Sequence, residues 1–159
     1  MTTTSTKPTS STKRRQSSLG AQVSVSILRT AAVLERFYNH VVAQHGITIQ
    51  QYDVLRILRS AGAKGLPTLT IRDRMIHEAP GITRLIDRLE QAGYARRVRT
   101  SPDRRQVLCQ IASQGTALLA HLDAAMAEAD AEAVSHLTVT QQRELLRLLQ
   151  EVRSGRPNS

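Results

Sequence analysis

The chain has 159 residues and a formal net charge of +9, a size suited to one domain and a charge that favours a polyanionic partner. Its single cysteine excludes an internal disulfide framework and a cysteine-rich metal site. No hydrophobic run approaches the roughly 20 residues of a membrane span. We therefore expect a cytoplasmic protein without a membrane partner.

The first elements are an arm and a long helix. Residues 1–18 are rich in Ser and Thr and hold four basic and no acidic residues, a composition typical of a disordered basic arm. Apolar residues then recur at steps of three and four, which predicts an amphipathic helix over about 22–45. We expect Gly46 to end this helix.

Three shorter helices are predicted next. Thr48 and Gln51 have the spacing of a capping box, which predicts the start of a second helix. A short third helix follows Pro67, capped by one of the next threonines. Pro80 suits the first position of a fourth helix, whose apolar residues fall at i, i+3, i+4 and i+7 until Gly93 ends it.

A basic β-hairpin follows the fourth helix. Two short alternating runs flank the turn of the stretch RTSPDRRQV, which occupies residues 99–107. The turn residues Pro102 and Asp103 predict a hairpin with a loop of more than two residues. Five arginines and one aspartate lie between Tyr94 and Arg105, so the hairpin suits an anionic partner.

Two more helices complete the chain, over about 114–136 and after a second capping box at 138–141. The predicted fold is mainly α, a winged helix-turn-helix with a two-stranded β-wing, flanked by N- and C-terminal dimerisation helices. We expect 47–112 to be the DNA-binding region. The wide apolar faces of the helices in 19–46 and 113–153 predict that those two segments form the dimerisation region.

The stretch APGITRLIDRLEQAGYARRVRTSPDRRQV, residues 79–107, resembles the MarR family of winged-helix transcription regulators. The matching residues are those of the recognition helix, 83–89, then Gly93, and the wing residues 103–105. The third helix departs from the family because it lacks the usual Leu-Ala pair. The resemblance implies a homodimer with recognition helices in major grooves and wings in minor grooves, where Asp103 would orient Arg105.

The predicted function is that of a sequence-specific double-stranded DNA-binding transcriptional regulator, a ligand-responsive repressor acting on an inverted repeat. Arg84 and Arg88 lie one turn apart, and which of them contacts bases stays open. We expect Asp87 to pair with Arg104 or Arg105 rather than to meet DNA. The predicted DNA-binding residues are Pro80, Gly81, Thr83, Arg84, Arg88, Arg97, Arg99, Asp103, Arg104 and Arg105.

A small phenolic or anionic effector is the other predicted partner, since many members of that family bind one between the dimer helices and the DNA-binding part. Ordinary helix packing explains the same residues equally well. The residues that could line such a cleft, with aromatic walls and a cation, are Arg36, Phe37, His40, Tyr52 and Arg56.

Other functions are less well supported by the residues. A constitutive or architectural DNA-binding protein would show the same motifs without a ligand response. An enzyme would have to recruit Cys109 with a histidine, yet no catalytic spacing supports it, and we expect Cys109 to be a half-buried packing residue. The five histidines include no pair at i, i+4, so we expect no metal and no cofactor.

Overall fold

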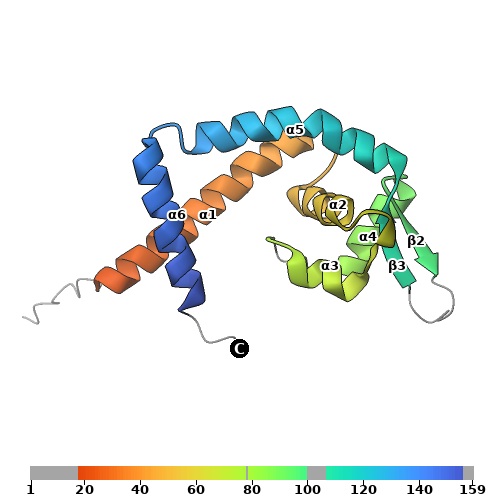
Figure 1. The fold of residues 1–159 in the computed structure, drawn as a ribbon, viewed down its shortest axis with the longest axis horizontal. Coiled ribbons are helices and arrows are strands. Elements are labelled where there is room, and N and C mark those ends of the chain that lie inside the picture. Colours follow the sequence, from red (N-terminus) through yellow and green to blue (C-terminus); the bar gives the residue numbers. More distant parts are fainter. Residues whose placement is uncertain (1–17, 78, 100–106, 156–159) are drawn as a thin grey trace, which may run out of the picture. The chain divides into compact units, whose positions relative to one another are not determined.

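The computed structural model describes residues 18–77, 79–99 and 107–155. Within them the predicted order of four helices, a hairpin and two helices is confirmed (Figure 1). The predicted arm over 1–18 lies outside the described residues apart from Ser18. The elements are α1 (Leu19–Ala43), α2 (Ile49–Ala61), the 3-10 turn η1 (Gly62–Lys64), β1 (Leu66–Pro67), α3 (Thr68–Arg74), α4 (Ile82–Gln91), β2 (Ala95–Arg99), β3 (Val107–Ile111), α5 (Ser113–Ala133) and α6 (Val139–Ser154).

The chain divides into two compact units, residues 1–33 and 34–159. In the described part of the first unit, the N-terminal portion of α1 exposes large apolar side chains along its length. Exposing these apolar side chains to water is unfavourable in free energy. The exposed side chains are Leu19, Val23, Val25, Leu28 and Val33.

The hydrophobic core of the second unit is built around α2. Three of its residues, Val54, Leu55 and Leu58, are completely buried, because their spacing puts them on the inward side of the helix. The helices α3, α4 and α5 and strand β3 all pack against α2. Their completely buried partners include Ile71, Leu89, Cys109, Leu119 and Leu122.

The predicted two-stranded wing is confirmed as the hairpin of β2 and β3, and a third strand, β1, which was not predicted, completes an antiparallel sheet in the order β1-β3-β2. β2 pairs with β3 as the predicted hairpin, and β1 adds Leu66 opposite Cys109. A strand of two residues is too short to show an alternating pattern. Gly65, at φ +65°, permits the approach, because a Cβ there would lie 2.6 Å from the carbonyl oxygen of Cys109.

Both predicted capping boxes are confirmed at Thr48 and Thr138, each with a glutamine three residues later. Two other helix starts differ from the prediction. The N-cap of α3 is Pro67 rather than a threonine, and α4 begins at Ile82 after Gly81, not at the preceding proline. Gly81 has a left-handed backbone at φ 90°, which a glycine adopts at little cost.

Candidate nucleic-acid interface

One side of α4 is buried and the other is open to solvent. Ile82, Ile86 and Leu89 face the core and are at most 7% exposed. Arg84 and Arg88 lie one helical turn apart on an exposed face. The predicted DNA-binding residues at or just before α4 are Pro80, Gly81, Thr83, Arg84 and Arg88, and none of them is buried.

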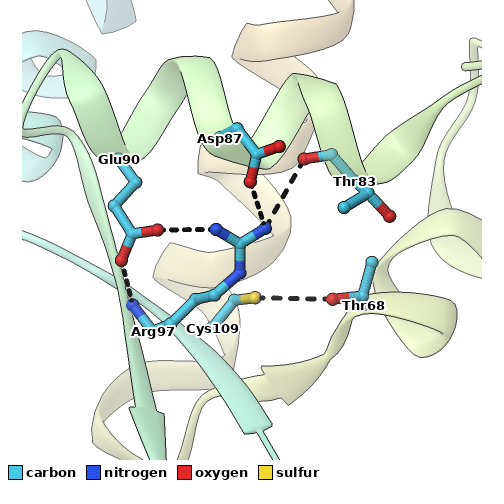
Figure 2. Close-up of polar contacts among 6 residues, drawn as sticks. All are labelled: Thr68, Thr83, Asp87, Glu90, Arg97 and Cys109. Carbon is cyan, nitrogen blue, oxygen red and sulfur yellow. Dashed lines mark hydrogen bonds and ion pairs between the residues drawn. The ribbon is translucent and has the colours of Figure 1, made fainter.

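Arg97 on β2 is bound to the flank of α4 (Figure 2). Its Nη2 lies 2.6 Å from Oδ1 of Asp87, and its Nη1 donates to Oε2 of Glu90 at 2.6 Å. The backbone N–H of Arg97 also donates to Oε1 of Glu90, at 2.9 Å, and Nη2 reaches the carbonyl oxygen of Thr83 at 3.5 Å. These contacts join α4 to β2, the first strand of the wing.

The charge on Arg97 is stabilised in this position. Burial by itself lowers the pKa of the guanidinium, but the hydrogen bonds and negative charges of Asp87 and Glu90 outweigh it and raise the pKa. The side chain is 26% exposed, so the two ion pairs are partly shielded from water. Arg97 is thus a permanent cation whose hydrogen bonds are directed toward α4.

Asp87 has a partner that the sequence did not predict. The partners expected from the sequence, Arg104 and Arg105, lie outside the described residues, and Asp87 pairs with Arg97. The reason is that Asp87 and Glu90 project from the same side of α4 as β2, and β2 places Arg97 between them. Arg104, Arg105 and Asp103 lie outside the described residues, so their role at the wing tip stays a prediction.

The remaining wing arginines differ in their surroundings. Arg99 is exposed at the end of β2, where its side chain is open to solvent. Arg96 is exposed too, and its Nε donates to Gln110 Oε1 across the hairpin at 3.1 Å. Gln110 Nε2 in turn donates to the carbonyl oxygen of Ala63 at 2.7 Å, which connects the hairpin to η1.

Cys109 is more buried than predicted. The residue is completely inaccessible, and Sγ lies 3.7 Å from the hydroxyl of Thr68 (Figure 2). Its strand β3 is paired on both edges, with β1 and β2, and the helices α2 and α3 pack against it. Cys109 is therefore a packing residue, as predicted, but of the core rather than of a half-exposed strand.

Sequence reasoning missed a polar pair next to α4. Asp53 on α2 is only 5% exposed, and its Oδ2 lies 2.6 Å from Nδ1 of His77, in the connector between α3 and α4. The backbone N–H of His77 donates to the same oxygen at 3.2 Å. One signal was available, because Asp53 stands between Tyr52 and Val54 in the stretch that builds the inward side of α2.

The residues predicted to line an effector site are only partly brought together. Arg56 lies over the ring of the buried Tyr52, with Cζ 5.7 Å from the ring centroid. Phe37 packs at a tilt against Tyr38, at 5.7 Å between centroids. Arg36 and His40 are not buried. A shallow hollow lies elsewhere, lined by Arg72, Met75, Ala79 and Pro80.

Two further contacts tie α5 to the helices beside the predicted effector residues. The hydroxyl of Tyr38 donates to Oδ1 of Asp130 at 2.8 Å. Arg59 holds both oxygens of Asp123, at 2.9 and 3.0 Å. The hydrogen bond from Arg59 lowers the pKa of Asp123, with burial opposing it and the positive charge of Arg59 adding to it.

Neither a metal centre nor a membrane span is formed by residues 18–77, 79–99 and 107–155. No group of three His, Cys, Asp or Glu side chains in these ranges is placed to hold a metal ion. In the same residues, none of the helices combines the length and the apolar character needed to cross a bilayer.

Comparison with known proteins supplies the family. Residues 45–106 match the MarR family. A MarR transcription factor from Planctomyces limnophilus is 34% identical, with 86% of this chain and 98% of that chain covered at a TM-score of 0.65. The chain spans about half the length of the first curated HTH-type transcriptional regulators that it matches.

Two similar structures contain ligands of their own. A mutant of MarR from Escherichia coli, in complex with operator DNA, is 23% identical and covers 86% of this chain and 99% of its own, at a TM-score of 0.74. A MarR family protein from Mycobacterium tuberculosis, in complex with salicylic acid, is 25% identical, with 87% and 98% covered at 0.65. The first likeness shows the fold alone.

Proposed function

We propose that this chain, which belongs to the MarR family, binds double-stranded DNA in a sequence-specific manner and regulates transcription. The observation that carries the proposal is the exposed face of α4, where Arg84 and Arg88 stand one turn apart beside the basic strand β2. The Escherichia coli relative with operator DNA supports it by analogy of fold. The region 47–112 is then the DNA-binding part.

In this proposal α4 reads bases and the wing supplies affinity. Arg84 and Arg88 have the reach to form two hydrogen bonds with a guanine edge in the major groove, which carries a distinct pattern for each base pair. Thr83 and the residues before it, Pro80 and Gly81, lie at the start of the same helix. Arg99, with the wing-tip residues Asp103, Arg104 and Arg105, would contact phosphates and the minor groove.

The role proposed for Arg97 is a supporting one. Its guanidinium contacts Asp87, Glu90 and the carbonyl oxygen of Thr83, all on α4. A phosphate would have to compete with two carboxylates for the same donors. We therefore assign Arg97 to holding the wing against α4, in place of the direct DNA contact that its position in a basic strand predicts.

The proposed assembly is a homodimer on an inverted repeat. Described residues of α6 expose large apolar side chains, among them Leu145, Leu146 and Val152, and the first unit exposes another set on α1. Burial against a second copy would remove such surfaces from water. The segments 19–46 and 113–153 then form the dimerisation region, and half-site centres lie roughly one helical turn, or about 10 bp, apart.

A response to a small phenolic or anionic effector is the finer part of the proposal. The Mycobacterium tuberculosis relative in complex with salicylic acid supports it. In this chain Arg56 is a cation that lies over the ring of the buried Tyr52. Repression would then end when the effector is bound. The alternative is a non-switching DNA-binding protein.

Selection of bound sequences from random duplexes by the full chain tests DNA recognition. We expect an enriched inverted repeat, and an affinity that falls as KCl rises, with a log–log slope near −5 if about 6 phosphates are neutralised. Absence of enrichment, or an affinity indifferent to KCl, would contradict the proposal. The selected duplex then serves in all later measurements.

Two further measurements address assembly and switching. Sedimentation should show a dimer, and Leu146→Arg should shift it toward monomer while the matched exposed-leucine variant Leu69→Arg should not. Salicylate should weaken binding of the selected duplex, and Arg56→Gln should abolish that response without changing ligand-free affinity. Indifference to salicylate and to related phenolic acids would favour the non-switching alternative.

A further inference from the structure

We infer that Asp53 and His77 form a positioning pair that sets where recognition helix α4 begins. The inference rests on the proposed function, because it assigns to the pair an effect on sequence-specific DNA binding. It adds two residues that contact no DNA in that proposal and that act through the connector between α3 and α4. The connector runs from Met75, the C-cap of α3, to Gly81, the N-cap of α4.

The geometry of the pair is specific. Among the described residues, Asp53 is the one charged residue that is buried, and it is 5% exposed. Its Oδ2 accepts from the backbone N–H of His77 at 3.2 Å and lies 2.6 Å from Nδ1 of the same residue. One carboxylate oxygen thus holds both the main chain and the ring of His77, which restrains the connector at one point.

Packing alone does not explain an aspartate at this position. A carboxylate is costly to bury, and an apolar side chain of similar size would fill the space next to Val54 and Leu55 without that cost. Asp53 provides a hydrogen-bond acceptor for His77, which an apolar residue could not provide. The burial of Asp53 is therefore explained by the residue that it holds.

Among the described residues, the start of α4 has no side-chain cap. Its N-cap is Gly81, which has no side chain, and no acidic residue occupies the first turn. Ile76, next to His77, is 77% exposed and does not anchor the connector in the core. The buried side of α4 sets which face points outward, whereas the contact at His77 restrains the chain leading into its first turn.

The consequence concerns the residues that follow Gly81. Thr83 and Arg84 lie two and three residues after it, so a displacement of the connector moves them directly. Hydrogen bonds to bases require donors within a few tenths of an ångström of the right place. Contacts to phosphates tolerate more displacement. Loss of the pair should therefore reduce affinity for the selected duplex more than affinity for unrelated duplexes.

Two amide substitutions separate the hydrogen bond from the bulk of the side chain. The side-chain nitrogen of Asn lies near the position of Nδ1, and that of Gln near the position of Nε2. His77→Asn should therefore keep the side-chain contact with Asp53, and His77→Gln should lose it, while both variants retain the backbone N–H that donates to the same carboxylate. Both variants are polar and neutral. His121→Gln on α5, at an exposed histidine, is the matched control.

The first measurement uses amide hydrogen exchange of the full chain without DNA. His77→Gln should exchange faster than wild type at residues 77–85, with His77→Asn and His121→Gln close to wild type. Unchanged exchange in His77→Gln, or equally fast exchange in both His77 variants, would overturn the inference. This result does not depend on DNA binding, so it tests whether the Asp53–His77 contact restrains the connector even if the proposed function fails.

The second measurement compares the affinity of each variant for the selected duplex and for a scrambled duplex. His77→Gln should bind the selected duplex roughly tenfold more weakly, with a smaller change for the scrambled one, and His77→Asn should recover most of the loss. Equal losses for both duplexes would overturn the positioning role. If the wild-type chain binds no duplex, the proposed function fails, and the exchange measurement still stands.

Discussion

Oδ1 of Asp87 on α4 and Nη2 of Arg97 on β2 lie 2.6 Å apart, so an ion pair joins α4 to the first strand of the wing (Figure 2). Glu90, one turn further along α4, binds the other terminal nitrogen of the same guanidinium. These contacts restrain β2 against α4 in the free chain. If α4 and the wing bind DNA as proposed, such a restraint reduces the conformational entropy lost on binding.

Removal of the ion pairs of Arg97 should weaken the attachment of β2 to α4. Arg97→Gln should lower the melting temperature and weaken binding to every duplex. A double-mutant cycle with Asp87→Asn should give a coupling free energy of about 0.5–1 kcal/mol, modest because Asp87 is 45% exposed. Arg96→Gln, on the same strand, is the control. Additive effects of the two substitutions on unfolding would show that the ion pair contributes nothing.

The two exposed arginines of the interface should behave differently. Arg84→Ala should relax the preference at one base pair of the selected sequence, by about 1–3 kcal/mol of discrimination. Arg99→Gln should weaken all duplexes alike and reduce the salt slope by about 1. Competition binding over a set of single-base variants at several KCl concentrations measures both effects. A base-specific effect at Arg99 would contradict its assignment to phosphate.

Tyr38 should make stability fall at alkaline pH. Burial, with the hydrogen bond and the charge of Asp130 adding to it, raises the pKa of Tyr38 to about 12 from 10.0. The unfolded chain releases this proton more readily, so the stabilisation is complete below pH 10 and is lost as pH rises from 10 toward 12. Urea unfolding at a series of pH values should show a smaller alkaline loss in Tyr38→Phe. An identical loss in both proteins would contradict the assignment.

Gly115 should not tolerate a side chain. It stands in the first turn of α5, where a Cβ would lie 2.2 Å from the carbonyl oxygen of Tyr94. Gly115→Ala should therefore cost about 1–3 kcal/mol of stability through displacement of the backbone around that carbonyl. Gly20→Ala is the control, because nothing lies within 4 Å of a Cβ at that exposed position. Equal unfolding midpoints for the two variants would contradict the prediction.

Local patterns in the chain were enough to predict most elements and the exposed side of the interface. The capping boxes at 48–51 and 138–141 were predictable because both partners are three residues apart. The burial of Ile82, Ile86 and Leu89 followed from helical spacing, which also leaves Arg84 and Arg88 on the outer face. These features depend only on neighbours along the chain.

Contacts between distant segments were not predictable in this way. The third strand β1 has two residues and no pattern, and it forms because Gly65 lets the backbone approach Cys109. The partner of Asp87 was predicted among the wing-tip arginines, which lie outside the described residues, and the ion pair that the structure shows with Arg97 was not predicted. Charge composition identifies the set of possible partners, whereas the path of β2 selects one of them.

The sequence by itself determined which segments are helical, which side of each helix is apolar, and that the positive charge gathers in the hairpin, because all three depend on residue order and spacing. Only the tertiary structure decided that Arg97 is held by α4 and that Asp53 is buried against His77. Asp53 and His77 are 24 residues apart, and a separation of that length lies beyond the reach of any helical or strand periodicity. Side chains that meet across elements are chosen by how those elements pack, and packing depends on the whole core at once.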